Sequence, residues 1–543
     1  MYKYSFLFVS IMSSATVAAQ DKTQEKYPTK SIEPYFGISL TDQERDSLKS
    51  NIDGFQKEYE ALHQYKMDNS VGMSLKFNPI PSDFNSTRVV STDPLKPEWN
   101  LPKDVALPAS REELAFYSVY KLAALVKNKK ITSTELTSLY ISRIKKYADT
   151  LQCVISLLED RAMRDAKKAD EEIAKGNYKG PLHGIPYGVK DLLAVEGTKT
   201  TWGATPFKDQ AIEKTADVVK QLESAGAVLI CKFTMGALAM GDIWYGGVTK
   251  NPWNMKQGSS GSSAGSASGT SAGLVAFSIG TETLGSIVSP STRCGVTGLR
   301  PTYGSVSTQG AMTLSWSMDK IGPICRSALD CGLVLNVISG QHPSITSKKN
   351  FKNLKVAYLK TAFDAAYPNK VNDEASLKVI RDMGFEPTAV ELPAGIPVSA
   401  IRIMLTAEAG AAFDELTRAN IDDQLTDQRK NAWPNTFRAS RFIPAVEYIN
   451  ASRARTQLIE AYHKKLGEFD VIISPSFANG QLLTTNLTGH PCLVVPNGFN
   501  DQGSPTSISF LGKLYGESAL VAFGRAYQEA SEWDEKTPPL FSK

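Results

Sequence analysis

A glycine- and serine-rich segment that becomes apolar is the feature that most constrains the fold of this chain. Residues 258–302 begin with fifteen residues that are mostly Gly, Ser and Ala, a composition typical of a flexible linker. A linker should stay polar, yet residues 273–280 form an apolar run of the buried-strand or buried-helix type. A second small-residue turn follows at Gly285 and Ser286. Two serine-bearing turns joined by a buried segment indicate a functional site, because glycine allows close backbone approach and serine supplies hydroxyl groups.

The residue types available suggest hydrolytic chemistry that uses neither a metal nor an organic cofactor. Cleaving an amide C–N bond requires a nucleophile, a base, an acid for the leaving amine and donors for the oxyanion. The chain has five histidines, and none lies in a metal-ligand motif such as HExxH. Lys190 ends the uncharged run 184–189. A buried lysine can serve as the base if its pKa falls by roughly 3 units, about 4 kcal/mol. The alternative is a surface lysine at the end of a strand.

Several motifs that occur in a fixed order resemble those of the amidase signature family. The first turn reads Gly-Ser-Ser-Ala-Gly-Ser from Gly261, and the second reads Leu-Gly-Ser-Ile from Leu284. A tail, Cys-Gly-Val-Thr-Gly-Leu-Arg-Pro-Thr, ends at Thr302. The other landmarks are a lysine motif and three downstream segments: residues 181–191, 319–323, 469–475 and 486–496. The resemblance extends from about residue 110 to about residue 530. It implies the amidase-signature fold and hydrolysis of a small-molecule amide.

The resemblance also implies a role for each matching residue. Ser286 matches the nucleophile, Ser262 matches a bridging serine that carries a cis peptide in the family, and Lys190 matches the base. The proton of Ser286 is expected to pass through Ser262 to Lys190. Ser262 then returns a proton to the leaving amine, and water attacks the acyl-enzyme. Ser263 is expected to support this relay as a hydrogen-bond partner. The oxyanion is expected to meet the backbone N–H groups of the second turn: Thr283, Leu284, Gly285 and Ser286.

The second turn departs from the family pattern at three positions. Leu284 stands where the family has a glycine, and a leucine with positive φ would be strained. Glu282 replaces an aspartate of the family pattern, and Val288 replaces an arginine that would lie near it. An ion pair at this turn would therefore need a positive charge from another residue. Two alternatives to an amidase therefore stay open. One is an esterase or amide-ester hydrolase on the same fold, and the other is a catalytically weak binding protein.

A competing motif overlaps the first turn. Residues 261–265 also satisfy G-x-S-x-G, the nucleophile elbow of α/β-hydrolases, with Ser263 as the nucleophile and His490 available as the late histidine. That fold requires a strand directly before the serine. Residues 250–257 contain Pro252 and two asparagines, which predict a loop. The pattern therefore favours the amidase interpretation over the elbow.

Composition and charge exclude other classes of protein. The 543 residues are 42% hydrophobic, enough for a sizeable core, and carry 60 basic and 56 acidic side chains for a net charge of +4. This balance indicates neither a nucleic-acid partner nor a membrane surface. The six cysteines are scattered and are expected to be small buried side chains. One disulfide stays open as an alternative in an oxidising compartment.

The N-terminus predicts export to the periplasm or beyond the cell. Residues 1–19 combine Lys3, a short apolar run and a Val-Ala-Ala end, the pattern of a signal peptide. The run is too short for a membrane span of about 20 residues. An exported member of the family would lack cytosolic ATP and charged tRNA, which leaves the role of a stand-alone hydrolase. Residues 20–105 form an N-terminal extension with one helix expected near 42–63, and residues 106–543 form the amidase domain.

The hydrophobic pattern predicts an α/β fold in which helices cover both faces of a central mixed β-sheet. A capping box at Thr132 begins one helix, and a second helix at 215–224 stops at Gly226. The acyl pocket is expected among variable loops at 235–245, 314–316 and 400–440. Five apolar runs predict strands: residues 227–231, 354–358, 470–474, 492–495 and 507–511.

Overall fold

The computed structural model describes residues 29–36, 42, 79–80, 101–340, 351–441 and 443–542. The chain divides into two compact units, residues 1–67 and 68–543. In the first unit, α1 spans Thr29–Phe36. The expected signal peptide lies outside the described residues, as does the helix expected near 42–63 apart from Asp42, which is helical. Across the described ranges, no helix is both long enough and apolar enough to cross a membrane.

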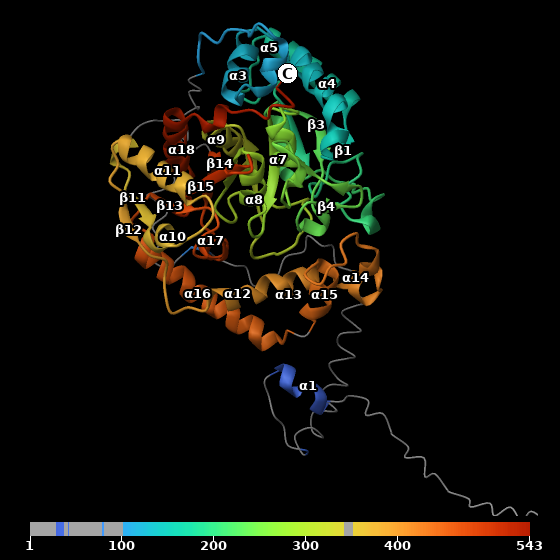
Figure 1. The fold of residues 1–543 in the computed structure, drawn as a ribbon. Coiled ribbons are helices and arrows are strands. Elements are labelled where there is room, and N and C mark those ends of the chain that lie inside the picture. The colour runs from blue at the N-terminus through green and yellow to red at the C-terminus, as the bar shows by residue number, and fades with distance from the viewer. Residues whose placement is uncertain are drawn as a thin grey trace, which may run out of the picture. The chain divides into compact units, whose positions relative to one another are not determined.

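The second unit is built around a mixed sheet that contains eleven strands in the part of the chain described here (Figure 1). β2 pairs in parallel with β3 and β8, and β11 pairs in parallel with β12 and β13, while the other neighbours are antiparallel. In spatial order the strands are β1 (Val154–Leu157), β3 (Val228–Phe233), β2 (Pro186–Lys190), β8 (Phe277–Glu282), β10 (Lys320–Cys325), β9 (Thr297–Arg300), β14 (Cys492–Phe499), β15 (Pro505–Gly512), β13 (Val471–Pro475), β11 (Val356–Leu359) and β12 (Thr388–Val390).

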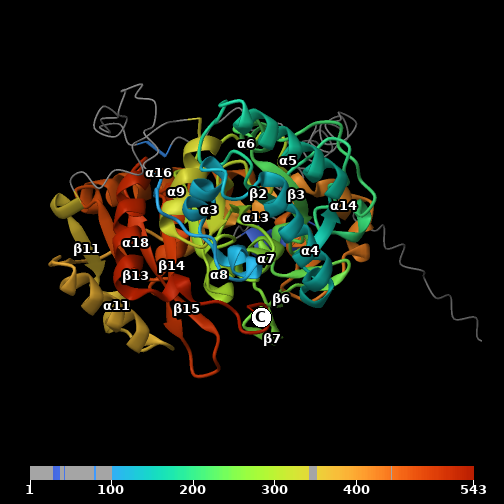
Figure 2. The same ribbon diagram turned by 90° about the horizontal axis from the view of Figure 1, so that it is seen from above.

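Helices cover both faces of this sheet, which confirms the predicted fold class (Figure 2). Strands β2, β3, β8 and β10 are buried along their whole length. Because successive side chains of a strand point to opposite faces, neither face of these strands meets solvent. The helices packed on the sheet include α4 (Ser133–Leu151), α5 (Glu159–Ala174), α7 (Ala264–Ser271), α8 (Val288–Cys294), α9 (Ala328–Ile338), α11 (Lys370–Asp382) and α18 (Glu517–Ser531).

A second group of helices packs together beside the sheet and is drawn in orange in Figure 1. Helix α13 contacts both α15 and α16, and α12 also contacts α16. This group comprises α12 (Val398–Ile401), α13 (Ile403–Ala412), α14 (Asp414–Arg418), α15 (Trp433–Ser440) and α16 (Ala445–Leu466). The remaining α-helices of this unit are α3 (Val119–Lys127), α6 (Asp217–Ser224), α10 (Lys360–Asp364) and α17 (Gln481–Thr488).

Most local predictions are confirmed, and one is wrong. The capping box begins α4, since the hydroxyl of Thr132 accepts from the N–H of Glu135 at 3.0 Å and the reciprocal bond measures 2.9 Å. The five predicted strands correspond to β3, β11, β13, β14 and β15. The loop predicted at 250–257 is instead a two-stranded ribbon of β6 (Lys250–Asn251) and β7 (Asn254–Gly258). Its Pro252 lies in the connecting turn, where proline is favoured. A second ribbon pairs β4 (Ile243–Trp244) with β5 (Gly247–Val248).

Candidate active site

The glycine- and serine-rich segment is a packed helix rather than a linker. Helix α7 is buried at every position. Its glycines allow this packing: a Cβ atom on Gly265 would lie 2.3 Å from the carbonyl oxygen of Cys153, and one on Gly269 would lie 2.3 Å from the Phe233 ring. The apolar run that follows was compatible with a strand or a helix, and from Phe277 it is strand β8. Together α7 and β8 bring the two serine-bearing turns to one place.

The first turn is fixed by close backbone contacts. The peptide bond between Gly261 and Ser262 is cis. A Cβ atom on Gly261 would lie 1.8 Å from the carbonyl oxygen of Gly241, so only glycine fits there. Ser262 is 1% exposed, and its carbonyl oxygen accepts from the N–H of Gly236 at 3.3 Å. The turn therefore presents the Ser262 hydroxyl from a tightly packed backbone.

Lys190 ends β2 and donates into the first turn. Its amine lies 2.8 Å from the Ser262 hydroxyl oxygen and 3.2 Å from that of Ser263. A third hydroxyl, that of Thr281 on β8, lies 2.9 Å away. The whole Lys190 side chain is buried, so it is not the surface lysine that the alternative proposed. The three contacts orient the amine toward the two serines.

The environment of Lys190 favours the neutral amine. Burial lowers the pKa of Lys190 from 10.5 to about 7, against the opposing influence of the Asp319 and Glu282 carboxylates. A hydrogen-bonded amine with a pKa near 7 exchanges protons readily at neutral pH. The lowered pKa makes the Lys190 amine suitable as a general base.

Ser263 occupies the position between Lys190 and β8. Its hydroxyl donates to the carbonyl oxygen of Thr281 at 3.1 Å and accepts from the N–H of the same residue at 3.1 Å. Its backbone N–H donates to the carbonyl oxygen of Ser286 at 3.2 Å. Ser263 thus links the lysine, the strand and both turns, which is the geometry of a supporting residue.

The second turn leads from β8 into α8 and carries Ser286, which is 7% exposed. Gly285 has the positive φ of this turn, +85°, and Leu284 does not have a positive φ. The side chain of Leu284 packs against an apolar cluster that includes Met318 and Leu487, so it is not strained. The described residues show no hydrogen bond between the Ser286 and Ser262 hydroxyls. Ser286 is instead joined to Ser263 and Lys190 through its carbonyl oxygen, which accepts from the Ser263 N–H.

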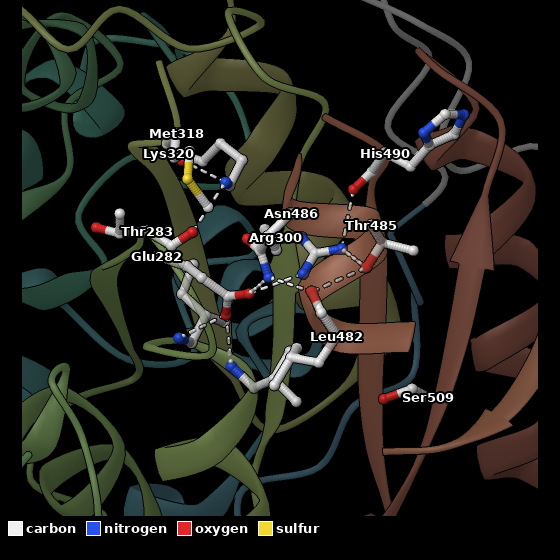
Figure 3. A network of polar contacts seen from close by, with 12 residues as sticks. Glu282, Thr283, Arg300, Met318, Lys320, Leu482, Thr485, Asn486, His490 and Ser509 are labelled. Atoms are coloured by element: carbon white, nitrogen blue, oxygen red, sulfur yellow. Dashed lines mark hydrogen bonds and ion pairs between the residues drawn. The ribbon is translucent and has the colours of Figure 1, made fainter. Parts of the chain in front are cut away.

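A buried ion pair between Glu282 and Arg300 supports the second turn (Figure 3). Glu282 accepts from Arg300 at 2.8 Å, and both side chains are fully buried. The second oxygen of Glu282 accepts from the N–H groups of Ile287 at 2.8 Å and Val288 at 2.9 Å. Arg300 also donates to Thr485 at 2.8 Å. Arg300 on β9 therefore supplies the positive charge that Val288 cannot.

Thr283 is held from the neighbouring strand. Its hydroxyl donates to Asp319 at 2.6 Å, and the Lys320 amine donates to its carbonyl oxygen at 3.4 Å. Asp319 precedes β10, whose first residue Lys320 pairs with Glu282. The Thr283 backbone is thus constrained at the point where oxyanion donors are expected.

Comparison with known proteins agrees with this geometry. The Amidase family model matches residues 135–485, roughly two thirds of the chain. The chain belongs to the amidase signature family. One relative is a glutamyl-tRNA(Gln) amidotransferase subunit from Marinomonas sp., 31% identical over 481 residues, which cover 78% of this chain and 98% of the relative.

Solved structures give the same result. The peptide amidase from Stenotrophomonas maltophilia superposes with a TM-score of 0.70 at 26% identity, covering 78% of this chain and 98% of that protein. An amidase family protein from Bacillus anthracis has the same TM-score and identity, with coverage of 79% and 93%. Family and fold agree, so this chain is an amide hydrolase.

Two cavities of this amidase lie beside the turns. The larger, about 610 Å³, is lined by Thr281 and Thr283 and by most of residues 303–321. The smaller, about 420 Å³, is lined by residues 240–243 together with residues 425–433. Of the loops where the sequence predicted a pocket, 235–245 contributes to both cavities, 314–316 to the larger and 400–440 to the smaller.

The structure does not support a nucleophile elbow in this amidase. The ribbon strand β7 precedes the first turn, but it pairs with β6 and is not part of the central sheet. The hydroxyl of Ser263 contacts Lys190 and Thr281. His490 is buried elsewhere, 2.8 Å from the Thr488 hydroxyl and with its ring 4.2 Å from that of Tyr462. The histidine that an elbow needs is therefore engaged in other contacts.

Four residues around the site were not predicted to act there: Thr281, Asp319, Lys320 and Arg300. Thr281 precedes Glu282 in the buried run, and only the contact with Lys190 distinguishes it from any other strand threonine. Asp319 belongs to the family motif at residues 319–323, and Arg300 belongs to the tail that ends at Thr302. The available signal was a charged residue in or directly before a largely apolar strand, Arg300 in β9 and Asp319 before β10, because buried charges are usually paired. The six cysteines are buried, as expected, and their thiols are free.

Proposed function

We propose that this chain is an exported amidase that cleaves carboxamides through an acyl-enzyme on Ser286. The observation that carries the proposal is the contact between the buried Lys190 amine and the Ser262 hydroxyl at 2.8 Å. A pKa of about 7 allows that amine to accept a proton at neutral pH. The catalytic domain is proposed to span residues 106–543.

The proposed reaction begins when the Ser286 hydroxyl oxygen attacks the amide carbonyl carbon. Its proton passes to Ser262 as the proton of Ser262 passes to Lys190. The carbonyl oxygen becomes an oxyanion that accepts from the backbone N–H groups of residues 283–286. Collapse of this intermediate breaks the C–N bond, and Ser262 protonates the departing amine while Lys190 restores its proton. Water then attacks the acyl-enzyme by the same relay in reverse and releases the carboxylic acid.

We propose a stand-alone role outside the cytoplasm. The support is the signal-peptide pattern of residues 1–19. An enzyme that works on tRNA needs the charged tRNA of the cytosol, which an exported protein does not meet. The relative from Marinomonas is named for a tRNA-linked amidotransferase, whereas the peptide amidase offers an analogy for a small-molecule amide substrate. Cell fractionation, with N-terminal sequencing of the recovered protein, should find it outside the cytoplasm and beginning near residue 20. Recovery of the intact N-terminus from cytoplasm would contradict export.

The activity is tested with purified protein and a matched pair of substrates, an anilide and the corresponding phenyl ester. Ser286→Ala should abolish turnover of the anilide while the circular dichroism spectrum stays unchanged. Ser289→Ala, a change to a nearby serine of α8, is the control and should retain activity. Turnover of the ester alone would favour the esterase alternative, and full activity of Ser286→Ala would refute the proposal.

A further inference from the structure

The two cavities touch different parts of the proposed relay. The larger cavity touches Thr283, the first of the four residues in the second turn whose N–H groups are proposed to bind the oxyanion. The smaller cavity touches Gly241, whose carbonyl oxygen lies against Gly261 in the first turn. Because Ser262 in that turn protonates the leaving amine in the proposed mechanism, the amine side of a substrate faces the smaller cavity. The acyl side then faces the larger cavity.

The charged groups in the wall of the larger cavity are already engaged. Among the described residues that line it, the charged ones are Asp319 and Lys320. One oxygen of Asp319 accepts from the Thr283 hydroxyl at 2.6 Å, and the other accepts from the N–H groups of Leu314 at 2.8 Å and Ser315 at 3.1 Å. Lys320 donates to the carbonyl oxygens of Met318 and Thr283. Asp319 thus has three hydrogen-bond donors, and burial lowers the pKa of Lys320 well below its ordinary value, which disfavours a charged amine in the wall.

Two charged residues behind the wall, Glu408 and Arg455, are also engaged in hydrogen bonds. Glu408 on α13 accepts from the hydroxyls of Ser315 and Ser317, both at 2.7 Å. Arg455 on α16 donates to the Ser317 hydroxyl oxygen and to the Ser317 carbonyl oxygen, both at 2.8 Å. The proton of each serine is thus directed to Glu408, away from the cavity. What remains at the surface is uncharged: hydroxyl groups, Gln309, and aromatic or aliphatic side chains.

We propose that the larger cavity binds the acyl part of the substrate and selects uncharged acyl groups. This inference rests on the proposed function. A carboxylate or an ammonium group in this cavity would lose its hydration without gaining a partner of opposite charge, which is strongly unfavourable. A neutral chain loses little, and a volume of about 610 Å³ accommodates chains of six or more carbons. The substrate class is therefore a medium-sized amide of a neutral carboxylic acid.

Two pairs of amides of matched size test this selection in the wild-type protein. Adipamide is compared with adipamate, whose far end is a carboxylate, and heptanamide with 6-aminohexanamide, whose far end is an ammonium group. The neutral member of each pair should have the higher kcat/KM by about tenfold or more, after correction for the second amide of adipamide. Charged members hydrolysed as fast as neutral ones would overturn the inference alone. Absence of turnover of every amide would instead overturn the proposed function.

A variant of the cavity wall identifies the cavity itself. Gln309 is exposed at the cavity and makes none of the contacts proposed for catalysis. Gln309→Lys should raise the ratio of kcat/KM for adipamate to that for adipamide about fivefold or more, and should lower the ratio for 6-aminohexanamide to adipamide. Gln309→Met, similar in length and neutral, is the control and should leave both ratios unchanged. If Gln309→Lys changed none of the ratios, the acyl group would not lie in this cavity and the inference would fail.

Discussion

The Glu282 carboxylate and the Arg300 guanidinium lie 2.8 Å apart in an ion pair next to the second turn, with both side chains fully buried. Burial alone would raise the pKa of Glu282, but Arg300 and Lys320 hold it down at about 2, so the carboxylate is ionised. The same carboxylate holds the N–H groups that begin α8. The position of Ser286 therefore depends on a charge pair supplied by two different strands.

Removing one member of this pair should destabilise the protein severely. Glu282→Gln keeps the size but leaves Arg300 buried without a counter-charge, and the free energy of unfolding should fall by about 3–5 kcal/mol. The double variant Glu282→Gln/Arg300→Met should lose less than the sum of the two single variants, because no unpaired charge remains. Urea unfolding followed by circular dichroism measures all three. Strictly additive losses would show that the pair is not coupled.

Leu284→Gly should affect stability more than catalysis. The φ of Leu284 is not positive and its side chain packs on the cluster that includes Met318, so glycine relieves no strain. We expect a loss of about 1–2 kcal/mol from unfolded-state entropy and lost packing, with kcat changed by only a few-fold. Thermal unfolding and steady-state kinetics are the measurements. A gain in kcat of about a hundredfold would mean that Leu284 distorts the oxyanion hole, as in a weak binding protein.

The rate should depend on the protonation of Lys190. Because burial lowers its pKa to about 7, the amine gains a proton as the pH falls below 7 and can no longer act as a base. We expect kcat/KM to decline about tenfold per pH unit on the acid side. Lys190→Ala should reduce the rate by about 10²–10⁴-fold. His490→Ala is the control, and retained activity in Lys190→Ala with loss in His490→Ala would refute the lysine mechanism.

The same shift predicts a change of stability with pH. The folded pKa of about 7 lies below the ordinary value of 10.5, so between these two values the unfolded chain holds the Lys190 proton and the folded chain does not. The free energy of unfolding of the wild type should therefore rise with pH relative to Lys190→Met, by up to about 1.4 kcal/mol per unit. Below pH 7 the buried charge carries its full penalty, and Lys190→Met should be the more stable protein. A difference that stayed constant from pH 7 to pH 10 would contradict the shift.

The sequence predicted most of the fold because its strands are short apolar runs bounded by polar turns. It predicted β3 and β13 correctly for that reason. It failed at residues 250–257, where the proline and asparagines that indicated a loop form the turn of a ribbon instead. Helix α7 has no apolar stripe to reveal it, because small residues pack against neighbours on every side. Such a helix is specified by close tertiary contact rather than by periodicity.

The candidate site was predicted in part. Lys190 at the end of β2 contacts Ser262 and Ser263 of the first turn, and the catalytic roles expected for these residues and for Ser286 stay predictions. Arg300 is separated from Glu282 by 18 residues, and only the pairing of β9 and β8 with β10 brings them together. Whether Leu284 is strained depended on the sign of its φ angle, which the amino-acid sequence does not reveal. The structure resolves that question by assigning the positive φ to Gly285.

Covalent labelling tests the central claim most directly. A fluorophosphonate probe should modify one serine in the native protein, and digestion followed by mass spectrometry should place the label on Ser286. Lys190→Ala should label far more slowly, because the relay that activates the hydroxyl is lost. Ser286→Ala should not be labelled at all. A label on Ser263, with none on Ser286, would contradict the account and identify a different nucleophile.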